Sequence, residues 1–328
     1  MQDSQRDIND LRLRSLSERL RGLLLPLPTP FSENGDLAWP HLKSNIASWN
    51  TTGIDGYVML GSTGERVHLD ESEYVQVIAT AREAVPRDLA FIVGVGQQST
   101  LGTIKEGKLA EDAGAEAVLV ITPSFYRTAI TQPALVSHYL AVADSSPVPV
   151  ILYSMPALTG IKIEPETVAR LSEHENIIGI KDSSADVEGL AETVRLVPED
   201  FAVLTGNGTV FQPALRAGAS GGILAVGCVA FDLCLEIFHA HRSGDSDRAA
   251  RLQEALTPLA AAVTTRFGIG GLKAALEMKG FAGGAVRAPL RAPNDEAREE
   301  IRSLLEAASQ AMNEEPIHEM TRNYTRES

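Results

Sequence analysis

The 328-residue sequence predicts an α/β protein, a (β/α)8 barrel (TIM barrel) with a C-terminal helical addition. Three observations support this prediction: eight short apolar runs, helix-length amphipathic stretches between them, and a purely helical pattern after residue 229. Eight strand–helix units in one chain close most simply into a barrel. A doubly wound sheet is the competing architecture, but the nearest match to its dinucleotide fingerprint, Gly94-Val95-Gly96, lacks the third glycine.

The eight apolar runs have the composition of buried parallel strands. They are rich in Val, Ile and Leu without polar alternation, as strands covered on both faces usually are. In order, they span residues 23–27, 57–60, 89–93, 117–121, 148–153, 177–181, 201–205 and 222–226.

The segments between the runs are predicted to be helices, and several have clear ends. Residues 70–85 and 100–113 are amphipathic, and Gly114 suits the position just beyond a helix C-terminus. Glu164-Pro165-Glu166 opens another helix, with proline in its first turn and acidic side chains near the positive end of the dipole. After the barrel we expect four helices, at residues 231–241, 246–266, 270–278 and 295–312.

These patterns divide the chain into four parts. Residues 1–21 are expected to form a polar N-terminal arm, residues 22–230 the catalytic barrel, and residues 231–312 the C-terminal helices. Residues 313–328 are polar and are expected to form a flexible tail, because polar chain ends are commonly frayed.

The composition excludes several classes of function. The chain carries 29 Lys+Arg against 43 Asp+Glu, a net charge of −14, which argues against a nucleic-acid partner because phosphate binding needs basic surface. No apolar run reaches the ~18 residues of a membrane helix, and the N-terminus lacks the apolar core of a secretory signal. We therefore expect a cytoplasmic protein with no membrane partner. The two cysteines, Cys228 and Cys234, give no disulfide framework, and no motif indicates a metal or a cofactor.

Chemically useful side chains follow three of the predicted strands. Active sites of such barrels lie at the C-terminal ends of the strands. The second strand is followed by Gly61-Ser62-Thr63-Gly64-Glu65, a turn with two hydroxyls and several backbone N–H groups that can cradle a carboxylate. The fifth strand ends in Tyr153 and the sixth in Lys181.

Lys181 is the residue on which a chemical hypothesis depends. It is one of only seven lysines and terminates an apolar strand. Burial disfavours the charged form of an amine and makes a lysine nucleophilic toward carbonyls. Position alone equally allows a lysine that reaches solvent or pairs with Asp182. Tyr153, taken alone, fits an ordinary core tyrosine better than a catalytic one, but beside an amine its phenol can move protons. The turn, the tyrosine and the lysine together favour an active site.

At these residues the sequence resembles the dihydrodipicolinate synthase/N-acetylneuraminate lyase family of pyruvate-dependent class I aldolases. The resemblance extends from about residue 22 to residue 308 and is carried by Gly61-Ser62-Thr63-Gly64-Glu65, Tyr153-Ser154-Met155-Pro156 and Gly179-Ile180-Lys181-Asp182. It implies a barrel enzyme that needs no cofactor and assembles as a homotetramer, a dimer of dimers.

The resemblance also implies roles for individual residues. Lys181 would form a Schiff base with the keto carbon of pyruvate or another 2-oxo acid, and Tyr153 would be the general acid and base. Ser62 and Thr63, with Gly61 beside them, would hold the pyruvyl carboxylate. Ile223 falls where the family places a backbone carbonyl of the last strand near the substrate.

Other positions bear on the second half of the substrate. The synthases of the family usually carry an arginine where this chain has Leu158, and the loss of that guanidinium argues against lysine biosynthesis. The family tends to place a tyrosine from a neighbouring subunit where this chain has Phe125, and Tyr126 is the next candidate for that role. Arg127 and Asn207 are candidates for contacting the aldehyde half of the substrate.

Within the family, three further stretches are most similar to 4-hydroxy-2-oxoglutarate aldolase, at residues 142–149, 262–269 and 287–290. The sequence therefore predicts a lyase that cleaves a 4-hydroxy-2-oxo acid, with 4-hydroxy-2-oxoglutarate as the first candidate, to pyruvate and an aldehyde such as glyoxylate. The alternatives are a 4-hydroxy-tetrahydrodipicolinate (dihydrodipicolinate) synthase, an aldolase or dehydratase of 2-keto-3-deoxy sugar acids, and a catalytically silent pyruvate-binding protein.

Overall fold

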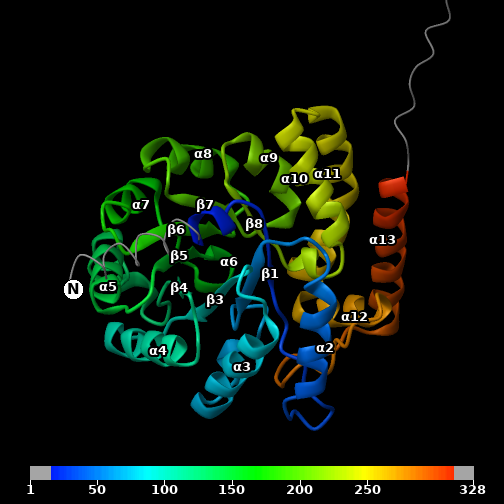
Figure 1. Cartoon of the computed structure of the whole chain (residues 1–328), viewed down its shortest axis with the longest axis horizontal. Helices are drawn as coiled ribbons and strands as arrows, with labels where there is room; N and C mark the ends of the chain where they lie inside the picture. Colours follow the sequence, from blue (N-terminus) through cyan, green and yellow to red (C-terminus); the bar gives the residue numbers. More distant parts are fainter. Residues whose placement is uncertain (1–15, 314–328) are drawn as a thin grey trace, which may run out of the picture.

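A computed structural model describes residues 16–313, and these residues form the predicted barrel with its helical addition (Figure 1). The predicted tail after residue 313, and the first 15 residues of the predicted N-terminal arm, lie outside the described residues. The eight strands pair in parallel, in sequence order, and close on themselves. They are β1 (Leu23–Pro26), β2 (Gly56–Met59), β3 (Ala90–Val95), β4 (Ala117–Ile121), β5 (Val150–Ser154), β6 (Ile177–Asp182), β7 (Ala202–Thr205) and β8 (Gly221–Ile223).

The helices surround the strands and continue beyond them (Figure 1). Around the barrel lie α2 (Trp39–Trp49), α3 (Glu71–Ala84), α4 (Thr100–Asp112), α5 (Gln132–Ser145), α6 (Pro156–Thr159), α7 (Pro165–Leu171), α8 (Val187–Leu196) and α9 (Phe211–Arg216). The addition consists of α10 (Phe231–Ser243), α11 (Ser246–Ala261), α12 (Gly268–Met278) and α13 (Asp295–Asn313).

Local sequence explains several of these helix ends. The Asp70 carboxylate accepts a hydrogen bond from the Glu73 N–H, and the Glu73 side chain accepts one from the Asp70 N–H, so a capping box starts α3. Ser99 caps α4 in the same position. Pro165 occupies the first turn of α7, as predicted.

Two predicted elements differ from the structure. The run 222–226 continues as a strand only to Ile223, after which residues 225–228 form a 3-10 helix at the mouth of the barrel. The single predicted helix 246–266 is divided, because residues 262–266 form a π-helical turn after α11. Such turns are irregular in hydrogen bonding, and apolar periodicity does not reveal them.

The inside of the barrel is filled by one cluster of apolar side chains. Strand residues such as Leu24, Ile92 and Leu204 share this cluster with Leu16 and Leu20, which precede β1. Leu20 is completely buried, and the Arg19 guanidinium anchors the same helical turn on Glu116 at 2.8 Å. This turn therefore closes the N-terminal end of the barrel, opposite to the end where active sites form.

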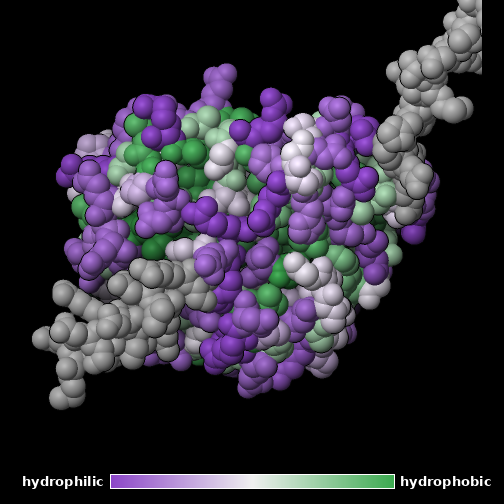
Figure 2. Space-filling model, turned by 45° about the horizontal axis from the view of Figure 1, so that its top comes forward, coloured by the Kyte–Doolittle hydropathy of each residue, from purple (hydrophilic) through white to green (hydrophobic). Residues whose placement is uncertain are grey.

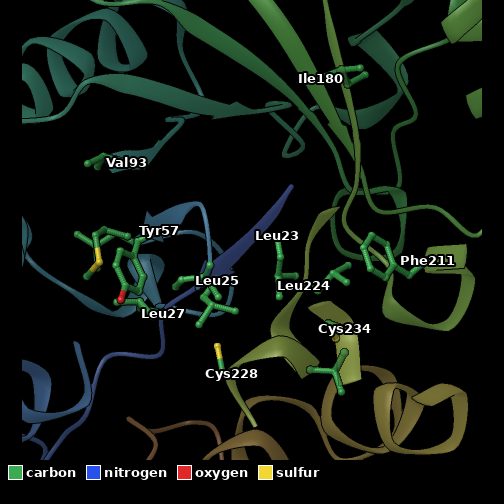
Figure 3. Packing of buried hydrophobic residues seen from close by; sticks show 14 of the residues in the cluster. Leu23, Leu25, Leu27, Tyr57, Val93, Ile180, Phe211, Leu224, Cys228 and Cys234 are labelled. Carbon is green, nitrogen blue, oxygen red and sulfur yellow. The ribbon is translucent and has the colours of Figure 1, made fainter. Parts of the chain in front are cut away.

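A second cluster joins the barrel wall to the C-terminal helices (Figure 3). Leu23 and Leu25 of β1 lie beside Leu224 and Cys228, and Cys234 of α10 belongs to the same cluster. Both cysteines are free and fully buried, and burial raises the pKa of both thiols. They act as small apolar residues of the core.

The surface is mixed in polarity. Figure 2 shows hydrophilic side chains over most of one face, with smaller hydrophobic areas between them. Among the helices of residues 16–313, none combines the length and the apolar character that a bilayer span requires. The same part of the chain contains no group of three or more His, Cys, Asp or Glu side chains suited to a metal ion.

Candidate active site

Lys181 and Tyr153 lie side by side inside the barrel, at its C-terminal end. They are paired in register on β6 and β5. Both are buried, and the Lys181 Nζ atom is 4.4 Å from the centroid of the Tyr153 ring. The amine therefore lies against the face of the phenol ring.

The geometry distinguishes between the two interpretations of Lys181. Successive strand residues point to opposite faces, so Asp182 faces away from the site. Its carboxylate accepts hydrogen bonds from the N–H and hydroxyl of Ser184, and burial raises its pKa. Within residues 16–313 no ion pair joins Lys181 to Asp182, and Lys181 is only 5% exposed. Lys181 is thus a buried amine rather than a surface lysine.

Space for the Lys181 side chain depends on a glycine that sequence reasoning missed. Gly206 follows β7, and a Cβ atom added there would lie 2.6 Å from Lys181 Cε and 1.9 Å from Ser183 Oγ. A larger residue at this position would therefore displace the Lys181 or Ser183 side chain. No local pattern in the sequence marks this glycine, because its neighbours come from the preceding strand.

The glycine-rich turn after β2 reaches the same site. The Ser62 Oγ atom lies 3.3 Å from the Tyr153 hydroxyl, and Thr63 is buried next to it. Gly64 packs so closely on Leu60 that an added Cβ atom would lie 2.8 Å from its Cα. The turn is a compact, pre-formed loop that presents Ser62 to the tyrosine.

The turn begins and ends at unusual backbone positions. Leu60 and Glu65 have φ angles of 53° and 54°, in the left-handed region that non-glycine residues seldom adopt. Each such position costs roughly 1–3 kcal/mol and persists only where surrounding contacts hold it. Strain of this kind is concentrated at functional sites, in agreement with the location of the turn.

Ile223 and Asn207 occupy neighbouring strand ends. Ile223 is fully buried on β8, in the interior cluster that also contains Tyr153. The Asn207 side-chain oxygen accepts hydrogen bonds from the Thr209 N–H and hydroxyl, so it caps a short helix after β7. The side-chain oxygen of Asn207 is therefore occupied, and its side-chain NH2 group is the part that could contact a ligand.

Phe125, Tyr126 and Arg127 lie on the loop after β4, at the surface of the chain. The rings of Phe125 and Tyr126 are 77% and 70% exposed and contact each other edge to face. They point to solvent and not into the Lys181 site of the same chain. The Arg127 side chain lies across Gly160, next to the end of α6, where Leu158 is 63% exposed.

These groups define a chemical class. A buried amine next to a phenol can condense with a ketone, and the phenol and Ser62 hydroxyl form a short route for protons. A barrel with this arrangement at the C-terminal ends of its strands is typical of class I aldolases, enzymes that work through an imine on a lysine.

The family follows from comparison with known proteins. Residues 19–308 match the dihydrodipicolinate synthetase family, and the chain belongs to this family of pyruvate-dependent class I aldolases. The chain is 34% identical over 286 residues to a 4-hydroxy-tetrahydrodipicolinate synthase of Syntrophus aciditrophicus, covering 87% of this chain and 97% of that protein.

Solved structures agree with this assignment. A dihydrodipicolinate synthase from Thermotoga maritima is 31% identical with a TM-score of 0.83, covering 88% of this chain and 98% of that one. A prophage protein of E. coli K12 from the same family, solved in complex with pyruvate, is 29% identical with a TM-score of 0.82 and the same coverage. The predicted family is confirmed. The finer similarity to 4-hydroxy-2-oxoglutarate aldolase is not reflected in these names: two are synthases, and the third gives only the family.

Proposed function

We propose that Lys181 forms a Schiff base with the ketone carbon of a substrate that contains a pyruvyl unit, and that the enzyme breaks the bond between C3 and C4. The observation that carries the proposal is the buried Lys181 amine, 4.4 Å from the ring of Tyr153. The family's use of pyruvate supports it.

The reaction can be written from these groups. The Lys181 amine adds to the ketone and water leaves, which gives a protonated imine. Tyr153 gives its proton to the departing hydroxide and becomes a phenolate. The phenolate then takes the proton of the C4 hydroxyl, the C3–C4 bond breaks, the electron pair moves into an enamine, and the aldehyde departs. Tyr153 returns this proton to C3 of the enamine, and addition of water to the imine, with its proton taken by the phenolate, releases pyruvate and restores the amine and the phenol. The imine replaces one difficult step with several easier ones.

The turn after β2 supplies the carboxylate site in this proposal. Ser62 and Thr63 provide hydroxyl donors, and Gly61 lies beside them in the same turn. Preorganised donors of this kind bind an anion without the reorganisation that water requires. The carboxylate would be held on one side of the ketone, with Lys181 on the other.

The proposed substrate is 4-hydroxy-2-oxoglutarate, cleaved to pyruvate and glyoxylate. Leu158 supports this choice over the synthase reaction, because an exposed leucine occupies the position where the synthases usually have an arginine. The names of the relatives favour the second candidate, condensation of pyruvate with aspartate semialdehyde. A third candidate within the family is an aldolase or dehydratase of 2-keto-3-deoxy sugar acids.

The assembly completes the proposal. We infer a cytoplasmic homotetramer in which Phe125 or Tyr126, exposed on one chain, approaches the site of a neighbouring chain. A tyrosine at that position would extend the route for protons from Tyr153, whereas a phenylalanine would only cover the site.

A substrate panel tests the proposed function. Purified protein is assayed for pyruvate release from 4-hydroxy-2-oxoglutarate and from 2-keto-3-deoxy sugar acids, and for consumption of pyruvate with aspartate semialdehyde. We expect kcat/KM for 4-hydroxy-2-oxoglutarate to exceed the others at least tenfold. A higher value for aspartate semialdehyde would establish the synthase instead, and no turnover of any substrate would favour the catalytically silent binding protein.

A further inference from the structure

A second buried lysine lies outside the proposed chemistry. Lys273 of α12 is 2% exposed, and its Nζ atom donates to the Glu65 carboxylate at 2.6 Å, where Glu65 is equally buried. The same ammonium donates to the backbone carbonyls of Thr29 at 2.7 Å and Ala285 at 2.6 Å. All three N–H donors of the ammonium are therefore used, as a buried lysine requires.

The Glu65 carboxylate is also fully engaged. Its Oε2 atom accepts from the Arg287 backbone N–H at 3.0 Å and faces the His68 Nδ1 atom at 3.1 Å, while Oε1 accepts from Lys273. Glu65 is the last residue of the glycine-rich turn, and its own N–H donates to the Ser62 carbonyl. The contacts of the Glu65 side chain thus fix a residue whose backbone is left-handed and is hydrogen-bonded to Ser62.

Lys273 reaches the turn by a second route. The Thr29 carbonyl accepts from Lys273, and the Thr29 hydroxyl donates to the Gly64 carbonyl at 2.7 Å. One ammonium therefore fixes Glu65 directly and Gly64 through Thr29. Both residues belong to the turn that would bind the carboxylate.

The Arg287 side chain connects the segment between α12 and α13 to the start of α3 and to neighbouring loops. Its guanidinium binds both carboxylate oxygens of Glu73 at 2.6 Å and the carbonyls of Gly35 and His68. Two residues of the helical addition, Lys273 and Arg287, are thus connected to the β2–α3 region. The addition is bonded to the site and not only packed beside the barrel.

A gain in stability alone does not explain the buried ion pair between Lys273 and Glu65. Removing two charges from water is costly, and a buried ion pair is often replaceable by apolar residues without loss of stability. Among residues 16–313, no hydrogen bond links Lys273 or Glu65 to Lys181 or Tyr153. Any influence on the chemistry must therefore pass through the turn.

We infer that Lys273 is a positioning residue for substrate binding: through Glu65 and Thr29 it holds Ser62 and Thr63 in the geometry that binds the pyruvyl carboxylate. This inference rests on the proposed function, because it assigns the carboxylate to the turn. It predicts that the helical addition contributes to affinity for 2-oxo acids and leaves the reactivity of the Lys181 amine toward other ketones unchanged.

The test compares two ketones that differ in the carboxylate. Imines on Lys181 are trapped with borohydride at increasing concentrations of pyruvate or of hydroxyacetone, and adducts are measured by peptide mass. The variants are Lys273→Met and, in case the single variant unfolds, the double variant Glu65→Met/Lys273→Met, which leaves neither charge of the buried pair unpaired. Arg298→Gln, which breaks the exposed ion pair between Arg298 of α13 and Glu277 of α12, the helix that carries Lys273, is the matched control.

We expect the half-maximal concentration of pyruvate to rise at least tenfold in both Lys273 variants, the loss expected for a hydrogen bond to a charged group. Hydroxyacetone trapping should stay within twofold, and Arg298→Gln should change neither. Equal weakening for both ketones would overturn the inference in favour of general support of the fold. Unchanged pyruvate trapping in a folded Lys273 variant would also overturn it. A wild-type protein without any adduct on Lys181 would overturn the proposed function, and this inference with it.

Discussion

Substitution of Gly206 by alanine is a sharp test of the geometry around Lys181. The added Cβ atom would lie 2.6 Å from Lys181 Cε and 1.9 Å from Ser183 Oγ. The Gly206 N–H donates to the Asp182 carbonyl at 2.6 Å and residue 206 directly follows β7, so the backbone is fixed and the two side chains must yield. Ser183 can rotate, but the lysine is enclosed by the barrel.

The size of the effect follows from the contact distance. Ordinary contacts of a Cβ atom begin at 3.4 Å, so Lys181 Cε must move by 3.4 − 2.6, or about 0.8 Å. A misplacement of about 1 Å at a reacting centre can reduce the rate by roughly 10²-fold. We therefore expect the rate of imine formation to fall by about two orders of magnitude.

The assay measures the rate at which a borohydride-trapped pyruvate adduct accumulates, followed by intact mass, with urea unfolding in parallel. Gly107→Ala is the control, because apart from the backbone of its own helix and its two chain neighbours no atom lies within 4 Å of an added Cβ in α4. Alanine in a helix interior should stabilise that variant by about 0.5–1 kcal/mol and leave trapping unchanged. A folded Gly206→Ala protein that traps pyruvate within threefold of the wild-type rate would refute the reasoning.

Three further predictions concern the proton route, the closed end of the barrel and pH. Tyr153→Phe should lower kcat by about 10²–10⁴-fold while the Lys181 adduct still forms, and a wild-type kcat would move the proton role to another group, with Tyr126 next. Leu20→Ala should cost about 2–5 kcal/mol in urea unfolding, whereas Leu101→Ala, 78% exposed, should cost less than about 0.5 kcal/mol; equal costs would contradict a barrel closed by Leu20. Burial lowers the pKa of His138 from 6.5 to about 4, so the folded state resists its protonation. Stability should therefore fall by about 3 kcal/mol as pH drops from 6.5 to 4, and His138→Gln should flatten this decline; parallel profiles would exclude His138 as its source.

Sequence patterns predicted the fold well because its strands are buried on both faces. Each apolar run corresponds to a strand, and the register of parallel strands then brings Tyr153 next to Lys181 without further information. The errors fall where hydrogen bonding departs from regular periods. β8 ends at Ile223, and a π-helical turn interrupts the helix predicted at 246–266.

The contacts that hold the site were not predictable in the same way. Lys273 lies in an apolar helix, and its partner Glu65 is 208 residues away in the sequence. Gly206 needs its small size because of the side chains of Lys181, on the preceding strand β6, and Ser183, which directly follows that strand. Both depend on the three-dimensional arrangement of distant segments, which apolar periodicity and local motifs do not encode.

The central claim is that Lys181 is the amine that reacts. Borohydride reduction in the presence of pyruvate, followed by peptide mapping, tests it against the other six lysines of the chain. The account predicts a single pyruvate adduct on the peptide that contains Lys181, and none in Lys181→Ala. An adduct on Lys162 or Lys273, or no adduct in the folded wild-type protein, would contradict it.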